Sequence, residues 1–308
     1  LDTSIKTMDD VERYLGLSVL AVIPKGAKFL TQDDPNSRFA EGYRILSAKL
    51  NLTGARQSAR SITVLSGGPG EGKSTTAFNL AWVCAQSGMK VMLIDGDIRR
   101  PSAHVAAGVE NTLGLGEFLA GQASLDELIQ ISNIPNLEVL TAGSLGPEDL
   151  GGFSRARFGS LLEICRSNYD VIVVDSPPVL GISDASVISQ EVDITLLLIQ
   201  HRRYPRSVSQ RAKRVIDEVG GKLYGVILNN VNIKTDDNYY YYAGYSSSYY
   251  GYRKRTPRNR QDESGVARGA RSAGVTTQAP QPFEQAGSQD GIQPVEEGSP
   301  ESAAEDRF

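Results

Sequence analysis

Hydrophobic residues gather in short, nearly continuous runs along the middle of the chain, and segments of helical pattern separate these runs. The runs occupy residues 62–65, 91–94, 171–174, 194–199 and 223–228. Strands that are apolar on both faces are typical of a parallel sheet covered by helices on both sides. The alternation therefore predicts an α/β fold with a mostly parallel β-sheet flanked by helices on both faces.

The first fifty residues carry the signals of two helices and one further strand. The polar stretch 7–10 precedes Val11 and resembles the capped start of a short helix. The apolar run 19–23 predicts a strand that ends at Pro24. A second helix is predicted over about residues 36–52, because apolar side chains recur there at helical spacing. These side chains are Phe39, Tyr43, Leu46 and Leu50.

A glycine-rich loop follows the apolar run 62–65 and directly precedes a helical pattern. Its sequence from Gly67 to Ser74 fits G-x-x-x-x-G-K-[ST], the phosphate-binding loop of P-loop proteins. Backbone N–H groups of such a loop surround the β-phosphate, the lysine reaches the β and γ oxygens, and the hydroxyl ligates Mg²⁺. The expected nucleotide contacts are Gly68, Pro69, Gly70, Glu71, Gly72, Lys73, Ser74 and Thr75.

Carboxylates stand at the ends of two predicted strands. Asp95 and Asp97 follow the run 91–94, and Asp175 follows 171–174. Parallel strands end at the same edge of a sheet, where ligands bind, so these acids are expected near the phosphates. Ser74, Asp95 and Asp175 are the expected magnesium ligands, because Mg²⁺ prefers oxygen. Lys73, Asp95, Asp97 and Asp175 are the expected catalytic residues, with Asp95 as first and Asp97 as second candidate for a general base.

Tyrosines are concentrated in one short segment, which holds eight of the 13 in the chain. They are Tyr239, Tyr240, Tyr241, Tyr242, Tyr245, Tyr249, Tyr250 and Tyr252. Gly, Ser and Ala interrupt them, so they form neither a helix stripe nor a strand alternation. An extended chain from Asn232 to Tyr239 spans about 25 Å, which is enough to enter a neighbouring site. The tyrosines are therefore candidate phosphate acceptors, and a sticky disordered segment is the alternative interpretation.

Amino-acid composition limits the classes of binding partner and indicates which part of the chain is disordered. The net charge of -4 argues against a general nucleic-acid binder. The stretch from Arg202 to Arg214 is basic; a solvated helix face is its default interpretation, and attraction to phosphotyrosine or anionic lipid is the alternative. Pro, Gly, Ser, Gln, Ala and Glu dominate from about Thr256 onward, which predicts a disordered tail.

Taken together, these motifs resemble the bacterial tyrosine kinases, or BY-kinases, that accompany capsule and exopolysaccharide co-polymerases. The resemblance covers roughly residues 1–252 and rests on 66–75, 93–101, 175–178 with Asp184, and the tyrosine cluster. It implies a P-loop NTPase fold and an ATP- and Mg²⁺-dependent autokinase that phosphorylates the tyrosine cluster of a neighbour in a ring. The implied divisions are a juxtamembrane lead-in packed on the kinase core (1–35), the kinase domain (36–235), the tyrosine cluster (236–252) and a disordered tail (253–308).

The resemblance also implies partners and a location. Regulation of polysaccharide polymerisation and export, a membrane-embedded activator or co-polymerase region, and a phosphotyrosine phosphatase belong to this picture. The chain begins with Leu1 instead of Met, which suggests a fragment from the cytoplasmic face of the bacterial inner membrane. Asn229 matches the family position near the adenine. Glu41 and Arg44 match the family's E-x-x-R-x-x-R oligomerisation helix, whereas Ser47 replaces its second arginine.

One residue of the glycine-rich loop bears on competing functions. Partitioning and division-site ATPases of the same broad class usually have lysine one residue after the first loop glycine, where this chain has Gly68. That difference favours a kinase. The alternative from another class is a nucleotide-switched ATPase that organises a polysaccharide export complex without tyrosine phosphotransfer.

Overall fold

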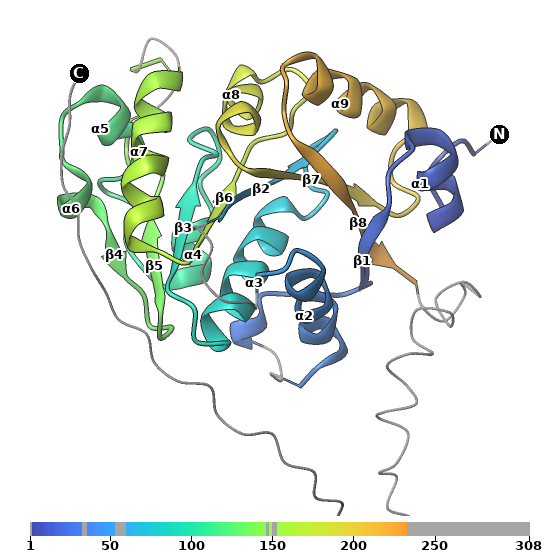
Figure 1. The fold of residues 1–308 in the computed structure, drawn as a ribbon, viewed down its shortest axis with the longest axis horizontal. Helices are drawn as coiled ribbons and strands as arrows, with labels where there is room; N and C mark the ends of the chain where they lie inside the picture. The colour runs from blue at the N-terminus through green and yellow to red at the C-terminus, as the bar shows by residue number, and fades with distance from the viewer. Residues whose placement is uncertain (1, 33–35, 53–59, 146–147, 150–152, 233–308) are drawn as a thin grey trace, which may run out of the picture. The chain divides into compact units, whose positions relative to one another are not determined.

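A single sheet organises the molecule, seen in a computed structural model that describes residues 2–32, 36–52, 60–145, 148–149 and 153–232 (Figure 1). The strands run in the spatial order β1-β8-β7-β2-β6-β3-β5-β4. Their bounds are β1 Val19–Pro24, β2 Arg60–Ser66, β3 Val91–Asp95, β4 Gln130–Ile131, β5 Leu137–Leu140, β6 Val171–Asp175, β7 Ile194–Gln200 and β8 Leu223–Val231. All neighbouring strands are parallel except the antiparallel pair β4 and β5. The predicted α/β fold with a mostly parallel sheet is therefore confirmed.

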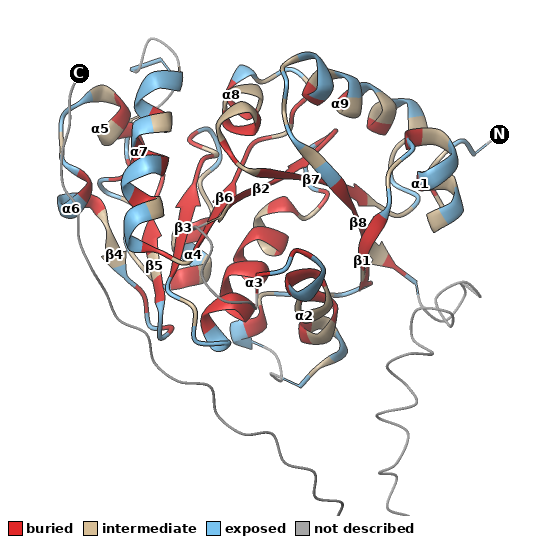
Figure 2. Ribbon diagram, in the orientation of Figure 1, coloured by how far each residue is buried: buried red, intermediate tan, exposed pale blue. Residues whose placement is uncertain are grey.

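Helices cover both faces of this sheet. The helices are α1 Met8–Leu15, α2 Arg38–Lys49, α3 Lys73–Gln86, α4 Ala103–Ala107, α5 Leu115–Ala120, α6 Leu125–Leu128, α7 Arg155–Asn168, α8 Ser183–Glu191 and α9 Arg206–Glu218, with a 3₁₀ turn η1 at Leu30–Gln32. α2, α3 and α4 pack on one face and α5 to α9 with α1 on the other, as Figure 1 shows. Burial follows this layering (Figure 2). The central strands β2, β3, β6 and β7 are almost entirely buried, whereas β4 and the start of β8 are partly exposed. Most of the outer helices are buried only on the side that faces the sheet, and α3 is buried on nearly all sides.

Local signals explain why the first two helices begin where they do. The Thr7 hydroxyl accepts a hydrogen bond from the Asp10 N–H, and the Asp10 carboxylate accepts one from the Thr7 N–H, which is a complete capping box for α1. The Ser37 hydroxyl caps α2 through the Ala40 N–H. Both helices predicted in this region are confirmed. The ends of α2 differ by a few residues from the predicted range.

The sequence pattern does not predict β4 and β5, because they are only two and four residues long. β5 nevertheless extends the parallel sheet beyond β3 through the pairs from Val91–Leu137 to Ile94–Leu140. Glu117 ties the loop after β5 to α5, since its buried carboxylate accepts hydrogen bonds from the N–H groups of Gly114 and Ser144. The part of the sheet beyond β3 is therefore held in place by contacts that no short sequence motif predicts.

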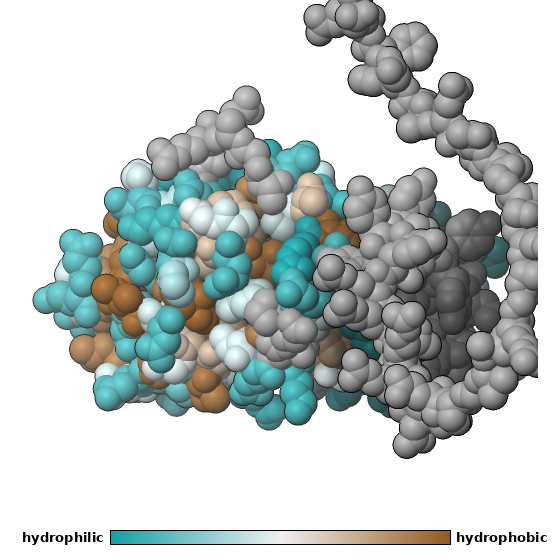
Figure 3. Space-filling model, turned by 90° about the horizontal axis from the view of Figure 1, so that it is seen from below, coloured by the Kyte–Doolittle hydropathy of each residue, from teal (hydrophilic) through white to brown (hydrophobic). Residues whose placement is uncertain are grey.

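The surface is mixed in character. On the face seen in Figure 3, hydrophilic and hydrophobic residues are interspersed wherever residues of uncertain placement do not cover them. Among the described residues the exposed large apolar side chains are Val105, Leu113, Ile131, Ile164 and Tyr224. No helix in the described part of the chain is both long and apolar enough to cross a bilayer.

Candidate nucleotide-binding site

The loop between β2 and α3 has the backbone of a phosphate cradle. β2 ends at Ser66 and α3 starts at Lys73. Gly70 and Gly72 adopt positive φ angles of 70° and 103°, which favour glycine. A Cβ on Gly72 would also lie 2.4 Å from Nδ2 of Asn229, so a side chain has no room there. Strand, glycine loop and helix thus have the order and shape predicted from the sequence.

Glu71 supports this loop from the inside. Only 4% of the residue is exposed, and its carboxylate accepts hydrogen bonds from the Gly68 N–H at 2.8 Å and the Gln200 N–H at 3.0 Å. Burial is the main cause that raises the pKa of this carboxyl above its ordinary value. The side chain therefore fastens the loop to the end of β7, and the Gly68 N–H is already engaged within the protein.

Lys73 lies inside the loop. Its Nζ donates to the Ser66 hydroxyl at 3.2 Å, and that hydroxyl donates to the Gly68 carbonyl at 2.7 Å. Burial lowers the pKa of the ammonium group, and the nearby carboxylates of Asp175, Asp97 and Glu71 oppose this shift. These carboxylates are close enough to act on the lysine, so the loop and the strand-end acids form one electrostatic site.

The carboxylates at the ends of β3 and β6 face each other. Asp95 and Asp175 are register partners in the parallel pair, and the Gly96 N–H donates to the Asp175 carbonyl at 2.8 Å. Both side chains are buried, with 0% and 1% of the residue exposed. Burial, followed by the charge of Asp95, raises the pKa of Asp175 to about 7. Two buried acids in adjacent positions disfavour each other's charge, unless a cation lies between them.

Asp95 and Asp97 differ in their hydrogen bonds. Oδ2 of Asp95 accepts from the N–H groups of Ser102 and Ala103 at 2.8 and 2.9 Å, so it holds the start of α4. Its Oδ1 has a longer contact of 3.3 Å from the Asp97 N–H. Asp97 is half-buried, and its Oδ1 accepts from the Arg100 N–H at 3.1 Å. Burial raises the pKa of both carboxyls.

Ser74 and Asp175 could hold a magnesium ion that also takes ligands from outside the protein. They do not form a site in which protein side chains supply every ligand. The Ser74 hydroxyl is hydrogen-bonded to Asp175, and Oδ1 of Asp175 is buried without a partner among the described residues. An orphaned buried carboxylate oxygen is an unusual feature that a cation would satisfy. The described residues contain no cluster of three or more His, Cys, Asp or Glu side chains arranged as a metal site. Mg²⁺ bound here would therefore complete its shell with water and phosphate oxygens.

Asn229 lies at the P-loop from the β8 side, inside the strand and not after its end. Its Nδ2 donates to the Glu71 carbonyl at 2.7 Å, and its Oδ1 accepts from the Asn230 N–H. The structure thus brings Asn229 together with the loop residues, as the predicted site requires. In this arrangement the side chain supports the loop, and its place near the adenine stays a prediction.

Sequence reasoning missed two residues beside the loop. Arg203 and Tyr204 follow β7, and the Tyr204 hydroxyl donates to the Pro69 carbonyl at 3.1 Å. Arg203 was part of a basic stretch whose default interpretation was a solvated face. The available signal was their position directly after a buried strand, at the edge of the sheet where ligands bind.

The remaining predictions fall outside this site. The tyrosine cluster and the tail lie outside the described residues. On α2, Glu41 and Arg44 form an ion pair of 3.3 Å, whereas Ser47 is 1% exposed, with its Oγ 3.7 Å from Sγ of Cys84. The position that carries the second arginine of the motif therefore faces the core in this chain.

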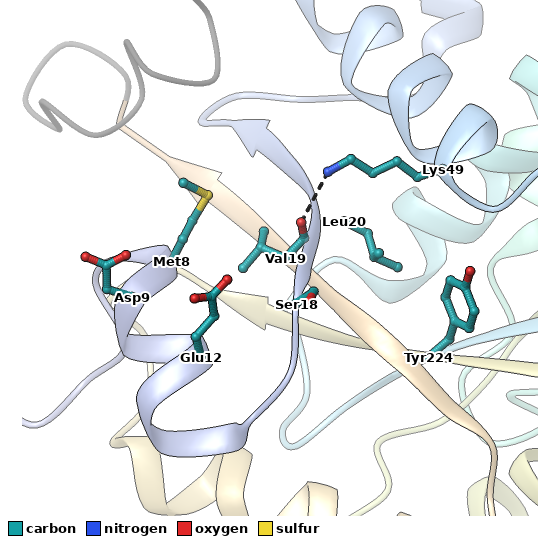
Figure 4. A pocket seen from close by; sticks show the side chains of 8 residues that line it. All are labelled: Met8, Asp9, Glu12, Ser18, Val19, Leu20, Lys49 and Tyr224. Carbon is teal, nitrogen blue, oxygen red and sulfur yellow. Dashed lines mark hydrogen bonds between the residues drawn. The ribbon is translucent and has the colours of Figure 1, made fainter.

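A separate hollow of about 470 Å³ lies at the opposite ends of the strands, where β1 and β8 begin (Figure 4). It is lined by Met8, Asp9, Glu12, Ser18, Val19, Leu20, Lys49 and Tyr224. Figure 4 shows Lys49 reaching the Val19 carbonyl across its rim, at 3.3 Å between Nζ and O. The hollow shares no residue with the phosphate cradle, so it is not part of the nucleotide site.

The sheet, the loop after its central strand β2 and the acids on β3 and β6 define a P-loop NTPase. Residues 59–220 match the family model described as AAA domain. Tyrosine-protein kinase YwqD of Bacillus subtilis (strain 168) is 34% identical over 214 residues, which cover 70% of this chain and 90% of YwqD. Tyrosine-protein kinase CpsD of Streptococcus pneumoniae serotype 4 is 35% identical over 200 residues, which cover 64% of this chain and 86% of CpsD.

Structural similarity leads to the same family. The kinase domain of the Escherichia coli tyrosine kinase ETK superposes with a TM-score of 0.69 at 29% identity and covers 76% of this chain and 97% of that domain. The chain belongs to the bacterial tyrosine-protein kinase family. The prediction of a protein-tyrosine kinase with a P-loop fold is therefore confirmed.

Proposed function

We propose that this chain transfers the γ-phosphoryl group of ATP to the tyrosines of its own C-terminal cluster, from Tyr239 to Tyr252. The observation that carries this proposal is the orphaned oxygen of Asp175 beside the Ser74 hydroxyl, at the end of the phosphate cradle where α3 begins. A hydroxyl and a carboxylate at this place are the elements that hold Mg²⁺ with nucleotide phosphates in P-loop enzymes. The cradle and the metal site together favour ATP as the phosphate donor.

Each part of the site has a role in this proposal. The backbone of the loop from Gly70 to Ser74 binds the phosphates, and Lys73 turns from Ser66 toward the β and γ oxygens. Ser74 and Asp175 would hold Mg²⁺, which neutralises charge on the phosphates when it is bound. Asn229 and Glu71 keep the loop in shape through the contacts given above.

Transfer breaks the bond between the γ-phosphorus and the bridging oxygen, which leaves with ADP, and forms a bond between phosphorus and a tyrosine oxygen. The tyrosine proton passes to a carboxylate at the end of β3. Asp95 is the first candidate, because its Oδ1 holds only the long contact from the Asp97 N–H. Asp97, which is half-buried and acts on Lys73, is the second candidate.

The proposal extends to assembly and location. We propose that chains form a homo-oligomeric ring in which one chain phosphorylates the cluster of its neighbour, on the cytoplasmic face of the bacterial inner membrane. A membrane-embedded activator or co-polymerase region, a phosphotyrosine phosphatase and polysaccharide export belong to this proposal. Glu41 and Arg44 lie partly exposed on α2, where this contact is proposed, whereas the buried Ser47 contributes no surface to it.

Labelling with γ-labelled ATP and Mg²⁺ tests the proposal. Wild type should carry label in the tyrosine cluster, and both Lys73→Met and the variant with all eight clustered tyrosines changed to Phe should remain unlabelled. An unlabelled wild type, tested also with a cognate membrane activator segment, or equal labelling of Lys73→Met, contradicts the proposal. If wild type binds ATP but never transfers phosphate, the nucleotide-switched scaffold is the better interpretation.

A further inference from the structure

The loop that follows β7 is held in a fixed conformation next to the phosphate cradle. Arg202 adopts a positive φ of 57°, which turns the chain sharply after the strand. The N–H of His201 donates to the Asn229 carbonyl at 2.8 Å, and the N–H of Arg202 donates to the Ile5 carbonyl at 3.1 Å. The next two residues, Arg203 and Tyr204, are therefore presented from an anchored backbone.

Tyr204 fills the space beside the start of the cradle. A Cβ on Gly68 would lie 2.6 Å from Cε2 of the Tyr204 ring, so the ring lies directly against this glycine. The Tyr204 hydroxyl donates to the Pro69 carbonyl at 3.1 Å. The two contacts fix the ring relative to the loop.

Arg203 uses this ring as a platform. Its Cζ lies 5.3 Å from the ring centroid of Tyr204, and its Nη1 donates to Oε1 of Gln200 at 3.1 Å. Its Nη2 lies 2.9 Å from the position that a Cβ on Gly70 would occupy. An exposed guanidinium is thus held against the tip of the loop whose backbone surrounds the β- and γ-phosphates.

The chemistry of this group selects its partner. A guanidinium is always charged, carries five N–H donors in a planar fork and matches phosphate oxygens in geometry. Lys73, in contrast, is a buried ammonium group with a single charge. A second cation near the loop tip would neutralise phosphate charge from the outer side of the loop, in addition to Lys73 and Mg²⁺.

We propose that Arg203 binds the polyphosphate of the nucleotide from the outer side of the loop, with Tyr204 as the residue that positions it. This inference rests on the proposed ATP-binding function. It adds an intramolecular arginine, supplied by the segment after β7, to the cradle formed after β2. Arg203 is then part of the binding machinery, and the other arginines of the basic stretch are not.

Nucleotide binding by calorimetry tests this role with ATP, ADP and AMP as probes. Arg203→Gln should weaken ATP and ADP binding about 10- to 100-fold, as expected for losing a charge-assisted hydrogen bond. AMP lacks the phosphates next to the loop tip, so its binding should change less than about threefold by the same principle. Arg203→Lys should recover part of the loss, and Tyr204→Phe should lose less than Arg203→Gln because the ring remains.

Arg211→Gln is the matched control, because it removes the same charge from an exposed position on α9. Its ATP and ADP affinities should equal those of wild type. Higher ionic strength should weaken wild-type ATP binding more than that of Arg203→Gln, since one ionic contact is missing in the variant. Urea unfolding without nucleotide should give similar stabilities for wild type and Arg203→Gln, which separates lost binding from lost folding.

Three results overturn the inference. The first is ATP binding by Arg203→Gln within twofold of wild type, and the second is an equal loss for ATP and AMP, which would make Arg203 a support for the loop only. In both cases ATP binding by wild type leaves the proposed function intact. The third is failure of wild type itself to bind ATP, which removes the proposed function and the inference together.

Discussion

Removing the carboxylate of Glu71 tests whether this residue acts on the protein or on the nucleotide. The structure predicts a structural effect, because the carboxylate accepts N–H groups from Gly68 and Gln200 and is 4% exposed. Glu71→Ala leaves the N–H groups of the buried Gly68 and the partly buried Gln200 without these partners, at about 1–3 kcal/mol each. We therefore expect the free energy of unfolding without nucleotide to fall by roughly 2–6 kcal/mol.

Glu71→Gln is the graded comparison. Its amide oxygen can accept one of the two N–H groups, while its NH₂ group faces the other donor, so we expect a loss between those of wild type and Glu71→Ala. Urea unfolding of the three proteins gives the stabilities, provided that the slopes of the transitions agree. ATP affinity should follow the same order, because a loosened loop no longer presents its N–H groups.

The opposite pattern would refute this reasoning. If Glu71→Ala unfolds within about 0.5 kcal/mol of wild type, the two hydrogen bonds do not stabilise the loop. If ATP binding is lost at the same time, the carboxylate acts on the nucleotide or its metal. Expecting Glu71 among the nucleotide contacts would then be justified for its side chain and not only for its backbone.

Two further predictions concern the acids on β3 and β6. Because the pKa of Asp175 is raised from 3.8 to about 7, the folded protein binds more protons than the unfolded chain between these values, and stability should fall as pH rises through this window. Asp175→Asn should flatten this fall and stabilise the metal-free protein at pH 8, measured by urea unfolding from pH 5 to pH 8; equal slopes would contradict it. Gly96→Ala should cost about 1–3 kcal/mol, because its Cβ would lie 2.7 Å from the Asp175 carbonyl oxygen. In the control Gly159→Ala the added Cβ would lie 3.0 Å from the far end of the Glu191 side chain and not against backbone, so the variant should be neutral or stabilising. Equal losses in both variants would contradict the clash.

Much of the fold follows from nearly continuous apolar runs of four or more residues. The apolar runs predict the central strands β2, β3, β6, β7 and β8, because strands buried on both faces need continuous hydrophobic sequence. β4 and β5 escape this reasoning, since β4 has only two residues and Glu138 interrupts the apolar sequence of β5. The antiparallel direction of β4 is set by a short turn, which the runs do not describe.

The position of a site residue was predictable where the residue is part of a recognisable sequence motif. Lys73, Ser74 and the strand-end acids are close together because strand ends meet at one edge of the sheet. Contacts between distant segments were not predictable. Glu71 and Gln200 are 129 positions apart in the sequence, so no local pattern indicates their hydrogen bond. Likewise, only folding brings Arg203 and Tyr204 beside the loop.

The charges around the loop divide into two complementary halves. Asp95, Asp97 and Asp175 gather negative charge on one side of Lys73, and burial raises the pKa of each carboxyl. This half is stabilised by a cation. The N–H groups of the loop and the guanidinium of Arg203 form the other half, which is stabilised by an anion.

A nucleotide with a divalent cation satisfies both halves at once, whereas either component alone leaves one half uncompensated. Binding of ATP and Mg²⁺ should therefore be mutually strengthening, and by linkage each should tighten the other by the same factor. Titrating ATP at several Mg²⁺ concentrations measures this factor. Because Oδ1 of Asp175 is the atom without a partner, Asp175→Asn should reduce the coupling more than it reduces the affinity for ATP alone.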